Sequence, residues 1–438
     1  MQKVKIQNEL NSYDSNNFLF FKYIICQIIF EVNISIAKNY IYTFFTIVII
    51  IIIIVENIYY KNIKDIKPFK KYVKDCKNLV KYERPKKYNK YPYISVCLSA
   101  LNMKNYIEKN LLSIINQSFQ NFEIVIINDF STDNTEKIIN KMQLKDDRIK
   151  LISHTKNLGV YRSRIESILN SNSEYVLLMD PDDMYLNENL FQELYDFNKK
   201  NNFDIIEFSV YQQYDGHSKI YYPNNHYETH YHQFSKNIIY QPELSNLLFF
   251  IPGTNIYSHT ICRNIWNKLI KRDIYIKTNK YIGREYYDAF IITADDMIMN
   301  IVTYNFAKNY TNIELPGYLY IIRKVSMSRG DGGVKLKEIR AMNHLFYFKI
   351  FYKYVLQYNK DRNFLFYEMK DLHRFFIDIK DLNMTKYIPA TKKFINKILG
   401  DKRISDEFKD YLEKLILYNY FHSICIFILF TKKFRLSF

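Results

Sequence analysis

The stretch ISVCLSALNMKNYIEKNLLSIINQSFQNFEIVIIND, residues 94–129, decides the fold class of the central part of the chain. Two continuous apolar runs enclose a segment whose apolar residues recur at helical spacing. The alternation continues to EYVLLMD at residues 174–180, with helical patterns at 131–142 and 159–169 on the way. Apolar strands that alternate with helices predict an α/β domain, with a Rossmann-type, mostly parallel sheet covered by helices on both faces.

Polar residues follow each expected strand at the point where it ends. They are Ser99 to Asn102, Asn128 with Asp129, His154, and the sequence DPDD at residues 180–183. Ligands of parallel sheets bind beyond the carboxyl ends of the strands, so we expect these residues to share one binding edge. A solvated loop is the alternative interpretation of DPDD, and the position of the sequence at this edge disfavours it.

The DPDD sequence places Asp180, Asp182 and Asp183 in a small volume. Like charges this close repel one another unless a cation neutralises them. The chain has only nine glycines, and neither GxGxxG nor GxxxxGK[ST] occurs, so dinucleotide and P-loop sites are not indicated. Carboxylate oxygens suit Mg²⁺ or Mn²⁺. We therefore predict a Mn²⁺ or Mg²⁺ cofactor that carries a nucleotide diphosphate.

Composition narrows the classes of partner. The length of 438 residues predicts two or three structural units, and the net charge of +17 suits an acidic partner such as a nucleotide or a phospholipid surface. No recognisable nucleic-acid-binding motif accompanies the basic residues, so we predict no nucleic-acid partner. The five cysteines are scattered and lack a CxxC pair, which indicates neither a disulfide framework nor a zinc site.

The most apolar stretch is IYTFFTIVIIIIIIV at residues 41–55, with tyrosines on both sides. With its flanks it approaches the ~20 residues that a membrane-spanning helix needs. We therefore predict a single-pass membrane protein with a span at 39–57. A buried strand or helix is the alternative, and a cleaved signal peptide fits less well, because no small-residue cleavage site follows.

The sequence contains signals for both orientations of the large C-terminal part, cytosolic and lumenal. Lys22 and Lys38 precede the span most closely, and six lysines follow it between residues 61 and 74, which places that part in the cytosol by the positive-inside rule. In the part that follows the span, the Asn-x-Ser/Thr triplets at Asn116, Asn309 and Asn383 argue instead for a lumenal side. Endomembrane and plasma membrane both remain as locations.

Ordered motifs extend beyond the alternating elements. Residues 94–135, NLGVYRSR at 157–164 and EYVLLMDPDDMY at 174–185 resemble the nucleotide-binding half of family 2 glycosyltransferases of the GT-A fold. Similarity continues through WNKLIKRDIY, YYDAFIITADDMIMN and YLYIIRKVSMSRG, and covers residues 91–330. The resemblance implies an inverting, metal-dependent hexosyltransferase-type enzyme. It would move a sugar from a nucleotide-sugar donor, expected to be a UDP-sugar, to a hydroxyl of a glycan, lipid or protein.

The resemblance assigns roles on the donor side. Ser99 and Asn102 would line the base pocket, Asp129 would accept a hydrogen bond from the base, and Arg164 would stabilise that pocket. Asp180, Asp182 and Asp183 would form the DxD site, with Asp180 and Asp182 toward the nucleotide and with Asp182 and Asp183 holding the metal.

The resemblance also assigns roles at the reacting centre. Asp296 falls at the place of the catalytic base, with Asp295 before it. A role of this pair in capping the following helix is the alternative. Arg323 and Lys324 are candidates for diphosphate contacts, and a plain basic turn explains them equally well.

With the resemblance, the chain divides into five parts. We predict a tail at 1–38, a transmembrane helix at 39–57, a Lys-rich stem at 58–90, a catalytic domain at 91–330 and a helical C-terminal region at 331–438. Residues 415–431 of that last region would either pack on the domain or lie on a membrane.

Some residues depart from the family pattern. Ser99, Leu101, Asn128 and Phe130 stand where proline, an aromatic residue, aspartate and glycine are frequent. These departures motivate a second hypothesis, a catalytically inactive member that binds a nucleotide-sugar or a glycan as a scaffold. A nucleotidyltransferase, which would also use acidic residues on an α/β sheet, is disfavoured by the absence of a Gly-rich loop near the first strand.

Overall fold

A computed structural model describes residues 90–218, 220–221, 238–241, 244, 264–323, 333–358 and 400–401. The predicted tail and transmembrane helix lie outside these ranges, as do almost all of the stem and most of the C-terminal region. Within the described ranges, the structure has no helix that is both long and apolar enough to cross a membrane.

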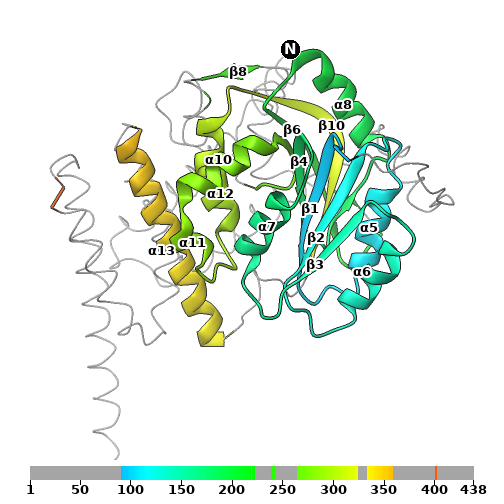
Figure 1. The fold of residues 1–438 in the computed structure, drawn as a ribbon, viewed down its shortest axis with the longest axis horizontal. Coiled ribbons are helices and arrows are strands. Elements are labelled where there is room, and N and C mark those ends of the chain that lie inside the picture. Colours follow the sequence, from blue (N-terminus) through cyan, green and yellow to red (C-terminus); the bar gives the residue numbers. More distant parts are fainter. Residues whose placement is uncertain are drawn as a thin grey trace, which may run out of the picture. The chain divides into compact units, whose positions relative to one another are not determined.

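The first half of the described chain alternates strands and helices as predicted (Figure 1). The elements are β1 (Ile94–Ala100), α5 (Ile107–Ile115), β2 (Phe122–Asn128), α6 (Thr135–Gln143), β3 (Ile149–Ser153), α7 (Val160–Leu169) and β4 (Tyr175–Met179). The four strands lie in the order β3-β2-β1-β4, and each neighbouring pair is parallel. Their carboxyl ends therefore meet at one edge of the sheet.

Side chains of β1 alternate between two cores, one on each face of the sheet. Val96 and Leu98 pack in the same cluster as Leu111 of α5, whereas Cys97 packs with Tyr161 and its neighbours on α7. Figure 1 accordingly places α5 and α6 on one side of the sheet and α7 on the other. The continuous apolar strands of the sequence thus reflect burial on both faces.

The second half of the described chain adds antiparallel strands. Its elements are β5 (Met184–Tyr185), α8 (Leu190–Asn201), β6 (Ile205–Tyr214), β7 (Ile220–Tyr221), β8 (Ile239–Tyr240), β9 (Lys268–Lys271), α10 (Arg272–Ile282), α11 (Arg284–Tyr287), α12 (Asp295–Phe306), β10 (Asn309–Ile322) and α13 (Gly333–Gln357). Strand β9 lies antiparallel between β4 and β6, and β10 follows β6 in parallel.

The expectation of a mostly parallel sheet was therefore too simple, because the sheet is mixed. Short strands such as β9 and β5 carry too few residues for their direction to be read from an apolar pattern. One local boundary also differs from the helix expected at 131–142. Helix α6 begins at Thr135 because the Asp133 carboxylate accepts a hydrogen bond from the Thr135 backbone N–H (2.9 Å).

Gly159 joins three parts of the binding edge at the start of α7. Its backbone N–H donates to the Asp129 carboxylate at the end of β2 (2.9 Å). Its φ of +93° is in a region that other residues rarely adopt, and a Cβ added here would lie 2.6 Å from the backbone oxygen of Ile291. This close approach brings the segment before α12 against the start of α7.

We expect Gly159→Ala to destabilise the protein in two ways. Backbone strain at a positive φ costs about 1–3 kcal/mol, and the clash with the Ile291 backbone adds a further 1–3 kcal/mol, roughly the cost of overpacking. Urea unfolding of the full chain, followed by tryptophan fluorescence of Trp266, would measure the loss.

Gly283→Ala is the matched control. Gly283 has nearly the same backbone conformation, with φ 98° and ψ 164°, but a Cβ there would have no atom within 4 Å. The difference between the two variants isolates the Ile291 contact. Equal losses would mean that this contact gives way at little cost.

Candidate functional site

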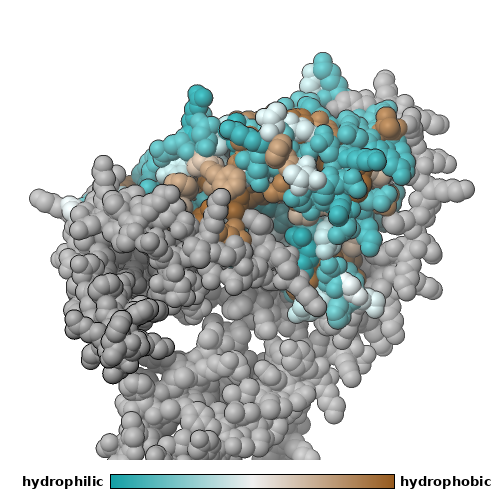
Figure 2. All heavy atoms as spheres, turned by 90° about the horizontal axis from the view of Figure 1, so that it is seen from below, coloured by the Kyte–Doolittle hydropathy of each residue, from teal (hydrophilic) through white to brown (hydrophobic). Residues whose placement is uncertain are grey.

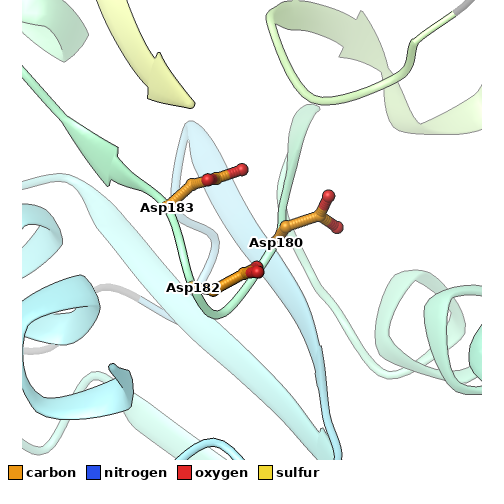
Figure 3. A group of neighbouring side chains, drawn as sticks. All are labelled: Asp180, Asp182 and Asp183. Carbon is orange, nitrogen blue, oxygen red and sulfur yellow. The ribbon is translucent and has the colours of Figure 1, made fainter. Parts of the chain in front are cut away.

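The DPDD loop connects β4 to β5 at the carboxyl edge of the sheet. Figure 3 draws its three carboxylates, which project to the same side of the loop. One oxygen from each of Asp180, Asp182 and Asp183 lies within 4.8 Å of the others. Helix α5 binds the loop, because the Asn110 side-chain amide donates to the backbone oxygens of Asp180 (3.0 Å) and Asp183 (2.9 Å).

Each of the three carboxylates already has a protein partner. Asp180 is paired with Arg164. Asp182 lies 2.5 Å from the Arg323 guanidinium. Asp183 is fully buried and accepts hydrogen bonds from the Tyr318 hydroxyl (2.7 Å) and from the Ile321 backbone N–H (2.7 Å). The predicted DxD residues are therefore brought together, and strand β10 supplies most of their support.

The pKa values of the loop indicate unneutralised negative charge. Burial and the charge of Asp180 raise the pKa of Asp182 to about 6, although Arg323 works against the shift. Burial and the charges of Asp182 and Asp180 raise the pKa of Asp183 well above its usual range. Clustered hard oxygen donors with excess negative charge fit a divalent cation such as Mg²⁺ or Mn²⁺.

Arg164 joins the DPDD loop to the second acidic pair. Its guanidinium is buried and donates to the carboxylates of Asp180 and Asp295. Burial alone would lower the pKa of Arg164, but the charges of Asp295, Asp180 and Asp296 outweigh it and raise the pKa. Arg164 was predicted to stabilise the base pocket, and the contacts that the structure gives it are to these two carboxylates.

Asp295 and Asp296 begin helix α12, and their surroundings differ. Asp295 is buried and paired with Arg164, while Asp296 is half-buried and accepts a hydrogen bond from the Met297 backbone N–H (2.9 Å). Burial and the neighbouring Asp295 raise the pKa of Asp296 to about 6, against the opposing charge of Arg164. Of the two, Asp296 is the carboxylate that no cation holds among the described residues.

The residues predicted for the base pocket lie on two adjacent strand ends. Ser99 is half-buried near the end of β1, and Asn102 follows in a left-handed conformation (φ 57°). The Asn102 side chain accepts a hydrogen bond from the Thr132 backbone N–H (2.8 Å), which ties the β1 loop to the β2 loop.

Asp129 is more enclosed than its predicted role in base recognition suggests. It is 2 % exposed, and its oxygens accept hydrogen bonds from the backbone N–H groups of Leu158 (2.8 Å) and Gly159 (2.9 Å) and from the His154 ring (2.8 Å). Phe130 beside it is 48 % exposed, with a φ of 68°. The β2 end therefore offers an aromatic surface next to a carboxylate that is largely used within the protein.

Arg323 directly follows strand β10, and its guanidinium lies 5.2 Å from the centre of the Tyr106 ring as well as beside Asp182. A plain basic turn therefore does not describe Arg323. Its predicted partner Lys324 lies outside the described residues.

Two supports of the site were not anticipated from the sequence. Tyr318 donates to Asp183 and accepts from the Asp180 backbone N–H (3.1 Å), and its ring stacks on Trp266 with centres 4.4 Å apart. Asn110 is buried on the apolar face of α5, next to Leu111. Its position among the apolar residues of this helix was the signal that the sequence offered.

The face seen in Figure 2 is mainly hydrophilic where described residues reach the surface, with hydrophobic residues gathered in one area.

Comparison with known proteins identifies the central part of the chain. Residues 95–266 match the family model described as glycosyl transferase family 2. This part of the chain is a family 2 glycosyltransferase domain. The predicted resemblance is confirmed, and the α/β sheet with helices on both faces fits the GT-A fold.

Individual relatives match shorter or more distant parts. An uncharacterized glycosyltransferase of Haemophilus influenzae is 35% identical over 103 residues, which cover 24% of this chain and 41% of that protein. Glycosyltransferase GlyA of Streptococcus pneumoniae is 26% identical over 241 residues, covering 54% of this chain and 31% of that protein. The chain thus spans less than half the length of either relative.

Among solved structures, S. aureus TarS 1–349 in complex with UDP-GlcNAc is similar to 76% of this chain and 89% of that chain. The TM-score is 0.46 and the sequence identity is 14%.

The acidic loop leads to a prediction about metal binding. Asp182→Asn should weaken Mn²⁺ binding by about an order of magnitude or more, because one charged oxygen ligand is lost. Protonated carboxylates do not bind metal, so the affinity of the unaltered chain should fall as the pH is lowered through about 6, the raised pKa of Asp182. Titration of the full chain with Mn²⁺, followed by electron paramagnetic resonance, measures both effects.

Asp147→Asn serves as the control, since Asp147 is exposed just before the start of β3. Unchanged Mn²⁺ affinity in Asp182→Asn would remove Asp182 from the set of metal ligands.

Proposed function

We propose that the chain is a metal-dependent, inverting glycosyltransferase that moves a sugar from a UDP-sugar to an acceptor hydroxyl. The observation that carries the proposal is the pairing of two acidic sites through one arginine. Asp180 of the DPDD loop and Asp295 at the start of α12 share Arg164, and Asp296 lies next to them. These contacts would hold a donor site and a candidate base in one network.

The donor side follows from the chemistry of the leaving group. A divalent cation held by Asp182 and Asp183 would stabilise the charge that develops on the departing diphosphate. Arg323, already beside Asp182, supplies a positive group in the same place. Asp180 remains oriented by Arg164 and is available to the nucleotide. The exposed ring of Phe130 and the Asn102 loop lie at the ends of the adjacent strands.

The acceptor side rests on Asp296. A pKa of about 6 leaves this carboxylate mostly ionised at neutral pH, yet basic enough to take a proton from a hydroxyl in the transition state. Asp295 is less suited to this step because its negative charge is held by Arg164. One base and direct displacement of the diphosphate would invert the anomeric centre of the sugar.

A second candidate function is nucleotide-sugar or glycan binding without turnover. It is motivated by Ser99, Leu101, Asn128 and Phe130, which stand where other residues are frequent in the family. The two candidates differ in one measurement. The full chain with Mn²⁺ and a panel of UDP-sugars should release UDP if it is an enzyme, whereas a scaffold would bind a UDP-sugar and release none.

Substitution of the candidate base should separate binding from chemistry. Asp296→Asn keeps the size of the side chain and its bond to Met297, so donor affinity should hardly change. Turnover should fall by ~10²–10⁴, the range typical of losing a general base. With saturating donor and metal, the turnover of the unaltered chain should rise with pH through about 6, and this rise should vanish in the variant. Near-normal turnover in Asp296→Asn would assign the base to Asp295 and leave Asp296 with a role in capping helix α12.

We also propose that residues 39–57 anchor the chain in a membrane, with residues 61–74 favouring a cytosolic catalytic domain. The support is the uninterrupted apolar sequence at 41–55. The full chain should resist alkaline carbonate extraction of membranes, and a chain with charged residues in place of Ile50 and Ile52 should be released. Release of the unaltered chain would contradict a spanning anchor.

A further inference from the structure

His154 occupies the binding edge without a role in the proposed reaction. It directly follows β3, and its side chain is 7% exposed. Its two ring nitrogens face two different carboxylates. Nδ1 lies 2.8 Å from an oxygen of Asp129, and Nε2 lies 2.7 Å from an oxygen of Glu166 on α7. The ring therefore bridges the end of β2 and the middle of α7.

Both carboxylates also accept hydrogen bonds from other groups. Asp129 accepts from the backbone at the start of α7, as described above. Glu166 accepts from the Arg162 guanidinium (2.9 Å) and from the Tyr287 hydroxyl of α11 (2.8 Å). Burial raises the pKa of Glu166, but the hydrogen bonds from His154, Arg162 and Tyr287 outweigh it and lower the pKa. Glu166 is thus an ionised acceptor with no proton to offer to the ring.

The two short contacts limit which protonation states of the His154 ring are compatible with the geometry. A neutral imidazole carries one N–H, and its other nitrogen has a lone pair. That lone pair would face a carboxylate oxygen at hydrogen-bond distance, which is repulsive. Two simultaneous bonds to ionised carboxylates need a proton on both nitrogens, so the geometry points to the imidazolium form.

The ring holds the helix that carries Arg164. Helix α7 is bound to Asp129 at its first turn, through Gly159, and to His154 through Glu166. Arg164 lies between these two attachments and donates to Asp180 and Asp295. A change in the position of α7 would therefore change the alignment of the carboxylates on both sides of the reaction.

We propose that His154 is a positioning residue of the donor site, whose imidazolium ring bridges Asp129 and Glu166. The charged and titratable groups that face it are Asp129 after β2, Glu166 and Arg162 on α7, and Tyr287 on α11. Its effect on donor binding rests on the proposed function, whereas its protonation does not. The two parts can therefore be tested separately.

The protonation is tested by ¹⁵N NMR of the full chain with labelled histidine. The chain has nine histidines, and the His154 signals are assigned as those lost in His154→Gln. At neutral pH both ring nitrogens of His154 should give the chemical shift of an N–H nitrogen, with two exchange-protected ring protons. A neutral ring with a single N–H would overturn the proposal, even if the protein proves to be a glycosyltransferase.

The positioning role is tested by calorimetric titration of the full chain with UDP in the presence of Mn²⁺. Glutamine can donate to only one of the two carboxylates. His154→Gln should therefore lower the affinity for UDP by roughly 3- to 30-fold, the range that coupled side-chain networks usually carry. Turnover at saturating donor should change much less. The matched control is His217→Gln, because His217 is exposed. It should leave the affinity unchanged.

The outcomes are distinguishable. If the unaltered chain does not bind UDP, the proposed function fails and the NMR result still decides the state of His154. If the unaltered chain binds UDP and His154→Gln binds it equally well, the positioning role is wrong. A thermal unfolding curve of His154→Gln confirms that a loss of affinity does not come from loss of the fold.

Discussion

The repulsion between carboxylates at one edge of the sheet is the constraint on which the site depends. Asp180, Asp295 and Asp296 come from two distant parts of the chain, and burial makes their charges costly. Arg164 resolves part of this conflict by bonding to one carboxylate of each part. Its planar guanidinium has donors for two carboxylates at once, which a lysine ammonium at the same place would not present in the same geometry. Helix α7 must therefore be held firmly, and the contacts of Gly159 and Glu166 do so.

The sequence was sufficient to predict the first half of the fold because two kinds of local pattern agree there. Continuous apolar runs mark strands buried on both faces, and the spacing of Ile107, Leu111 and Ile114 marks a helix between two of them. The position of DPDD at a strand end then located the acidic loop. Each of these inferences needs only neighbours in the sequence, which is why they were confirmed.

The remaining features depend on pairings between distant residues. The antiparallel direction of β9 is set by its place between β4 and β6, which a run of four residues does not encode. The hydroxyl of Tyr318 reaches Asp183 across 135 positions in the sequence. In the sequence, nothing distinguishes Tyr318 from the other tyrosines of a chain that has 41 of them. His154 was noticed as a strand end, but its two carboxylate partners become neighbours only when β2, β3 and α7 have packed.

Support from β10 also determines when the site can exist. The matched family region ends at residue 266, whereas Asp183 is bonded by Tyr318 and by the Ile321 backbone, and Asp182 by Arg323. During synthesis, more than a hundred further residues must therefore be added after the acidic loop before Tyr318, Ile321 and Arg323 are available to bind it. Closing so long a separation is slow compared with forming local contacts. The β3-β2-β1-β4 sheet can thus form first, with the DPDD loop still exposed to water, and the site is completed only when the last strand docks.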